Sequence, residues 1–161
     1  IGMDFWSLPD STAIEFKNPL FSELIRRIDV IPVTILHELI HRNQSIKNSG
    51  SLLDKCLIEG GADFIAYLVT KKLNNPTMHA IANAREHDLW VRFKKDMMEN
   101  NSTYWLYNNY DSSRPRDLGY WMGFKICENY YNTAHDKTRA VYEIINIDNS
   151  SVFLAASNYG L

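Results

Sequence analysis

The segment TILHELIH, residues 34–41, places two histidines four residues apart, with a glutamate directly after the first. We expect a helix here, in which side chains four residues apart lie on one face, about 6 Å apart at Cβ. His37 and His41 can then present two imidazole nitrogens to one Zn²⁺ ion. Glu38 lies about 100° further round the helix, where its carboxylate can act as base toward a metal-bound water. The alternative is a chance pattern of polar residues.

The residues around this motif are apolar on nearly every side of the expected helix, so we expect the helix to lie deep in the core. They are Val33, Ile35, Leu36, Leu39 and Ile40. Two histidines and a glutamate buried there would be destabilising unless they had polar partners. A metal ion supplies such a partner, and a satisfied network of polar side chains is the plainer alternative.

A second segment, EGGADFIAYL at residues 59–68, carries two carboxylates four residues apart. A turn at residues 48–50 leaves room for the helix that contains Glu59 and Asp63 to fold back against the first helix. We expect the small residues 60–62 to keep this helix slim where it approaches the metal. In the alternative interpretation, Glu59 is an exposed helix carboxylate and Asp63 is the partner in a salt bridge.

The extended zinc motif HExxHxxGxxH is excluded, because Gln44 and Lys47 stand where it requires glycine and histidine. The two segments together instead resemble the gluzincins, thermolysin-like metallopeptidases whose second helix carries Glu-x-x-x-Asp. The resemblance implies three zinc ligands: His37, His41 and Glu59. It also implies that Glu38 is the general base and that Asp63 orients His37 by a hydrogen bond.

Composition sets the outer limits of the interpretation. Hydrophobic residues make up 45% and charged residues 22% of the chain, a balance typical of globular domains. A net charge of −2 offers no basic surface for nucleic acid, and no apolar run reaches the ~20 residues of a transmembrane segment. Cys56 and Cys127 fit either one disulfide or two thiols. We expect one domain over residues 1–161 and, because the chain starts at Ile1, we expect it to be the C-terminal part of a longer protein.

Helix start signals and apolar periodicity predict a mainly helical chain. The expected helices cover residues 19–28, 32–45, 51–74, 77–98, 118–131, 136–147 and 150–157. In the fourth of them we expect Ile81 to face the core, and His79 and His87 to lie at the surface. With the gluzincin resemblance, the fold class is mainly α within the α+β zincin-like class. We expect its N-terminal edge strand to be largely missing from this chain.

Later segments carry a second resemblance. The stretches DLWVRFKKDM, YWLYNN, RPRDLGYWMGFKICENYY and DKTRAVYEIINID are similar to a family of bacterial predicted zinc-dependent proteases, which includes relatives of gliding-motility lipoproteins of Bacteroidetes. The resemblance covers nearly the whole chain from Leu20 onward. It implies a peptide or protein substrate, and it favours the cell envelope as the location.

Gluzincins also have a tyrosine or histidine that stabilises the oxyanion. The candidates here are Tyr120, Tyr130, Tyr131, His79, His87 and His135. We choose Tyr120, because the flanking Gly119 and Gly123 allow two backbones to approach each other, as near a cleft. The alternative is a core tyrosine with its hydroxyl at the surface. Arg114 and Arg116 are candidates to bind a substrate carboxylate, or else they are solvated loop residues.

These features predict a zinc metallopeptidase that hydrolyses peptide bonds, in which Glu38 activates a zinc-bound water and Tyr120 stabilises the oxyanion. One alternative is a catalytically silent binding or scaffold protein of the cell envelope that retains the zincin fold. Another is a zinc hydrolase of non-peptide amides. We expect Trp90, Trp105 and Trp121 to pack in the core, with a carbohydrate- or peptide-binding surface as the alternative.

Overall fold

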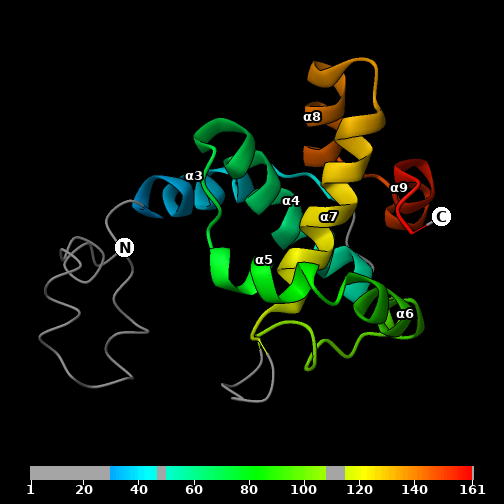
Figure 1. Ribbon diagram of the computed structural model, residues 1–161. Coiled ribbons are helices and arrows are strands. Elements are labelled where there is room, and N and C mark those ends of the chain that lie inside the picture. Colours follow the sequence, from blue (N-terminus) through cyan, green and yellow to red (C-terminus); the bar gives the residue numbers. More distant parts are fainter. Residues whose placement is uncertain (1–29, 47–49, 108–114, 161) are drawn as a thin grey trace, which may run out of the picture.

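The structure, a computed structural model, describes residues 30–46, 50–107 and 115–160, and within these ranges it contains helices and no strand (Figure 1). The helices are α3 (Ile31–His41), α4 (Leu52–Thr70), α5 (Pro76–Asn83), α6 (Glu86–Asp96), α7 (Leu118–Thr133), α8 (Lys137–Ile145) and α9 (Ser150–Ser157). The expectation of a mainly helical chain is therefore confirmed for the described residues. The helix expected at residues 19–28 lies outside them, as does any N-terminal edge strand.

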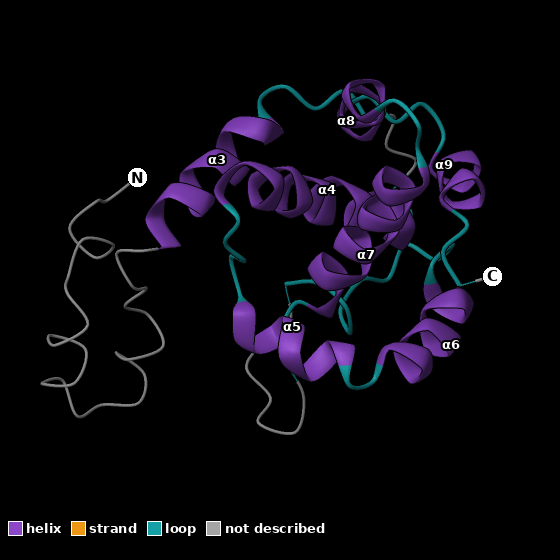
Figure 2. Ribbon diagram, turned by 45° about the horizontal axis from the view of Figure 1, so that its top comes forward, coloured by secondary structure: helices purple, strands orange, loops and turns teal. Residues whose placement is uncertain are grey.

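Helices α4 and α7 cross at the centre of the molecule, as both views show (Figures 1 and 2). A Cβ added to Gly60 of α4 would lie 2.2 Å from the backbone nitrogen of Phe124, and one added to Gly123 of α7 would lie 1.8 Å from the carbonyl oxygen of Cys56. The two backbones are thus in direct contact. We expected the small residues 60–62 to make room for a metal; at Gly60 that interpretation was wrong, because this glycine makes room for α7.

The N-terminus of α4 is built by local sequence. The Ser51 hydroxyl accepts a hydrogen bond from the backbone N–H of Asp54, and the Asp54 carboxylate accepts one from the N–H of Ser51, each at 3.2 Å. This reciprocal pair satisfies two backbone donors that the first turn of a helix leaves unpaired. It fixes the start of the helix that carries Glu59 two turns later.

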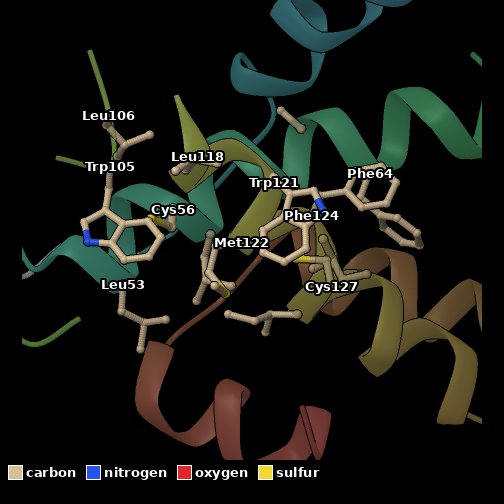
Figure 3. Packing of buried hydrophobic residues seen from close by; sticks show 14 of the residues in the cluster. Leu53, Cys56, Phe64, Trp105, Leu106, Leu118, Trp121, Met122, Phe124 and Cys127 are labelled. Atoms are coloured by element: carbon tan, nitrogen blue, oxygen red, sulfur yellow. The ribbon is translucent and has the colours of Figure 1, made fainter. Parts of the chain in front are cut away.

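Large aromatic side chains fill the core around this crossing (Figure 3). Trp105 and Trp121 are 0% exposed, and each indole N–H donates to a side chain: Trp105 to Asp96 at 2.9 Å and Trp121 to Asn83 at 2.8 Å. For these two residues the alternative of an aromatic binding surface is wrong.

Of the two alternatives for the cysteines, the structure shows two thiols. Cys56 and Cys127 are both buried and free, and burial raises the pKa of each.

Helix α3 packs against α4 and buries only one face (Figure 2). Val33, His37 and Ile40 are buried, whereas Ile35 is 37% and Leu39 is 49% exposed. The prediction of a helix buried on nearly all sides was therefore wrong. Residues spaced three to four apart form the stripe that meets α4, which is the ordinary pattern of a surface helix.

The single helix expected over residues 77–98 is two helices, α5 and α6, separated at Ala84 and Arg85. The break follows Asn83, whose side chain is held by the buried indole of Trp121, a tertiary contact that periodicity does not reveal. Ile81 is exposed rather than in the core. Among the helices that the structure describes, none combines the length and the apolarity needed to cross a membrane.

Candidate metal centre

Three side chains from α3 and α4 converge at one point. The Nε2 atoms of His37 and His41 lie 2.8 Å apart, and Oε2 of Glu59 lies 3.5 Å from the first and 3.3 Å from the second. His37 is buried, whereas His41 and Glu59 are partly buried. These three residues form a group that could hold a metal ion.

The ring orientation of His37 is set from the opposite side of the imidazole. Its Nδ1 lies 2.7 Å from Oδ1 of Asp63, one turn after Glu59 on α4, so the contact that the gluzincin resemblance implies is present. Asn74 donates to the same oxygen at 3.2 Å, and the Thr34 hydroxyl on α3 lies 3.0 Å from the Asn74 amide oxygen. Because a carboxylate only accepts, Nδ1 of His37 carries the proton and Nε2 presents its lone pair.

His41 has a different partner, which sequence reasoning missed. Its Nδ1 lies 2.7 Å from Oε1 of Gln44, and Nε2 of Gln44 donates to the carbonyl oxygen of Ile58 at 2.8 Å. The carbonyl only accepts, so the amide NH₂ must face it and the amide oxygen must face His41. Nδ1 of His41 therefore carries the proton, and its Nε2 also presents a lone pair to the centre.

The centre thus brings together two imidazole lone pairs and a carboxylate oxygen, which are all acceptors. A cation is needed to satisfy them, either a proton or a metal ion. Burial alone would lower the pKa of His37, but its hydrogen bonds to Asp63 and Glu59 and their charges raise it to about 9. Burial alone would raise the pKa of Glu59, yet hydrogen bonds to His37, His41 and Tyr107 hold it well below its usual range.

These three potential ligand atoms fit Zn²⁺. Ligand atoms bound tetrahedrally at about 2.0–2.2 Å stand about 3.3–3.6 Å apart. The two nitrogen-to-oxygen separations, 3.3 and 3.5 Å, lie in that range. The two nitrogens are closer, at the distance of a hydrogen bond, which matches a proton shared between them. Two histidines and one carboxylate leave a further position open, as catalytic zinc sites do.

Glu38 follows His37 on α3, and its side chain is exposed. The following residue, Leu39, is exposed as well, whereas His37 belongs to the buried residues of α3. The side chain that directly follows a histidine of the centre in the chain is therefore accessible to solvent.

Tyr120, in the first turn of α7, is brought to the centre. Its ring is stacked on that of His37, with the centroids 6.1 Å apart and the planes at 22°. The residue is partly buried, and burial, followed by the negative charge of Glu59, raises the pKa of its hydroxyl. The hydroxyl thus stays protonated at neutral pH and able to donate a hydrogen bond.

Tyr107 is a further side chain that sequence reasoning missed. Its hydroxyl donates to Oε1 of Glu59 at 2.6 Å. It belongs to the stretch YWLYNN, and no periodic pattern in the sequence relates it to Glu59, which lies 48 residues earlier. Only the fold reveals the contact.

The remaining candidates lie apart from the centre or outside the described residues. Arg114 is outside them, and Arg116 is exposed. His87 and His135 are also exposed, as expected for His87, but His79 is buried against the ring of Phe124, with the centroids 4.7 Å apart, so its predicted surface position was wrong. The Tyr130 hydroxyl bonds to Glu143, and the Tyr131 ring lies under the Lys137 ammonium.

Comparison with known proteins agrees with this geometry. Residues 17–152 match the family described as Predicted Zn-dependent protease (DUF2268), and the matched span contains every residue of the centre. No curated protein and no solved structure matches the chain. The match extends over most of the sequence, and the chain therefore belongs to the DUF2268 family of predicted Zn-dependent proteases.

Proposed function

We propose that this protein is a zinc-dependent peptidase with a gluzincin-type helical core, in which His37, His41 and Glu59 hold the metal. The proposal is supported mainly by the convergence of three acceptor atoms, which are the Nε2 atoms of the two histidines and one carboxylate oxygen of Glu59. The partners of the two Nδ1 atoms place the ring protons there, so that neither Nε2 of a neutral ring is a hydrogen-bond donor. Each histidine has its other nitrogen occupied, which gives both rings the tautomer that metal ligation requires.

When bound, Zn²⁺ supplies a Lewis acid that polarises a substrate carbonyl and lowers the pKa of water toward about 7. The residues of the chain supply the proton transfers. Glu38 accepts a proton from the water that attacks the carbonyl carbon, and then passes it to the amide nitrogen as the C–N bond breaks. Glu38 directly follows His37 in the chain and its side chain is accessible to water, which supports this role.

Tyr120 donates a hydrogen bond to the oxyanion of the tetrahedral intermediate. Its stacking on His37 keeps the ring beside the centre, and its raised pKa keeps the hydroxyl protonated. A donor that is already in place where negative charge develops lowers the barrier without reorganisation at the moment of reaction. The substrate class in this proposal is a peptide or protein.

The experiment that tests the proposal replaces Glu38 with glutamine, which keeps the shape and the metal ligands and removes the base. Cleavage of a peptide library by wild type and by Glu38→Gln is measured with equal zinc content, and Glu99→Gln, another exposed glutamate, is the control. We expect the rate to fall by about 10²–10⁴-fold in Glu38→Gln only. Equal rates in the three proteins would contradict the mechanism. Zinc binding without cleavage of any peptide would instead favour a catalytically silent scaffold.

A further inference from the structure

Tyr107 combines an exposed ring with a short hydrogen bond. The residue is 64% exposed, and its hydroxyl lies 2.6 Å from Oε1 of Glu59. Burial of apolar surface does not explain the position of a ring that remains largely in water. A hydroxyl bonded to a carboxylate is a strong, short interaction, so the contact with Glu59 is what orients this side chain.

The backbone of Tyr107 is held in an unfavourable conformation. Its φ is +54°, in the left-handed region that bulky residues rarely adopt. Its N–H donates to Oδ1 of Asp117 at 2.9 Å, and Asp117 itself has a φ of +57° just before α7. Non-glycine residues in such conformations persist where the surrounding structure demands them, and they gather at functional sites.

The residues before Tyr107 form a rigid base. Trp105 and Leu106 are buried, and the Trp105 indole donates to Asp96 at 2.9 Å. The carbonyl oxygen of Trp105 accepts from the N–H of Gly119 at 2.7 Å, which joins the turn to the start of α7. The Tyr107 side chain therefore extends toward Glu59 from a point fixed to two parts of the core.

The two oxygens of Glu59 have separate partners. Oε2 faces the Nε2 atoms of His37 and His41, at 3.5 and 3.3 Å, whereas Oε1 accepts from Tyr107. We propose that Tyr107 is a positioning residue that holds Oε1 away from the metal, so that Glu59 binds it through Oε2 alone. The inference rests on the proposed function. A carboxylate that gives one oxygen rather than two preserves the open position that substrate requires.

The test compares Tyr107→Phe with Tyr142→Phe. Tyr142 lies on α8 and is 67% exposed, so the control removes a hydroxyl from an equally exposed ring. The zinc dissociation constant is measured by competition with a chelator, and the visible spectrum is recorded with Co²⁺ in place of zinc. Co²⁺ absorbs more strongly in four-coordinate sites than at higher coordination numbers, so the spectrum reports whether Glu59 offers one oxygen or two.

We expect Tyr107→Phe to weaken zinc binding about 10- to 100-fold, as the loss of a ligand's hydrogen-bond partner does. We also expect the Co²⁺ absorption of this variant to fall, and Tyr142→Phe to match wild type in both measurements. A Tyr107→Phe protein with the affinity and spectrum of wild type would overturn this inference and leave the proposed function in place. A wild-type protein that binds no zinc would overturn both.

Discussion

Gln44 lies between His41 of the metal centre and the main chain of α4, with its amide oxygen 2.7 Å from Nδ1 of His41 and its amide nitrogen 2.8 Å from the carbonyl oxygen of Ile58. It joins the second histidine to the residue directly before Glu59. One neutral side chain thus sets the tautomer of His41 on α3 and bonds to the segment of α4 that carries Glu59.

Replacing Gln44 with leucine should therefore weaken zinc binding. The variant keeps a side chain of similar size but leaves Nδ1 of His41 without its acceptor and removes the side-chain donor to the Ile58 carbonyl oxygen. We expect an affinity about 10- to 100-fold lower. Asn43→Leu is the matched control, because the Asn43 amide is exposed and donates to the Leu39 carbonyl oxygen. Chelator competition gives both affinities. If the two variants bind zinc equally well, Gln44 does not support the site.

The adjacent glycines of α4 should respond in opposite directions to alanine. At Gly60 a methyl group would meet the backbone of Phe124 at 2.2 Å, so Gly60→Ala should destabilise the fold by about 3 kcal/mol or more. At Gly61 the nearest atoms to a methyl group are 3.5–3.7 Å away, which is ordinary contact. Gly61→Ala should therefore stabilise the protein by about 0.5–1 kcal/mol, because alanine loses less backbone entropy in a helix.

Urea unfolding of the two variants beside wild type measures these differences. A Gly60→Ala protein as stable as Gly61→Ala would mean that the backbones of α4 and α7 do not touch.

Zinc binding should release protons at neutral pH. The pKa of His37, raised to about 9 by its hydrogen bonds to Asp63 and Glu59, means that this ring is protonated at pH 7 when a chelator has removed any metal. Zinc requires the neutral ring, so protons compete with it below pH 9, and the competition weakens as pH rises. We expect the apparent affinity to increase about tenfold per pH unit between pH 7 and 8.

Calorimetry in buffers of different ionisation enthalpy counts the protons that zinc displaces. We expect at least about one proton per zinc at pH 7. An enthalpy that is the same in all buffers, with an affinity independent of pH, would contradict the proposed protonation of His37.

Part of this site was predictable because its geometry follows from spacing within helices. His37 and His41 are one turn apart on α3, and Glu59 and Asp63 are one turn apart on α4. The structure places His37, His41 and Glu59 around one point, with Asp63 hydrogen-bonded to the other nitrogen of His37. Repetition every four residues is a local property, so it is visible in the sequence once a helix is expected. The packing of α4 against α3 was also predictable, because the connection between the two helices is short.

The contacts that sequence reasoning missed are set by packing. Tyr107 reaches Glu59 across 48 residues, and Gln44 reaches Ile58 across 14, with no periodic pattern in either case. The break between α5 and α6 follows a hydrogen bond from Trp121 to Asn83. The exposure of Ile35 and Leu39 was also not predictable, because a helix that is apolar all round does not show which side a neighbour will cover.

The zinc content of the purified protein tests the proposed metal centre most directly, measured by elemental analysis on wild type and on His41→Ala after dialysis without a chelator. We expect close to one zinc ion per chain in wild type and its loss in the variant, with the helical fold retained in both. Equal zinc in the two proteins would place the metal elsewhere. The absence of zinc from wild type would mean that His37, His41 and Glu59 form a proton-sharing polar cluster and not a metal centre.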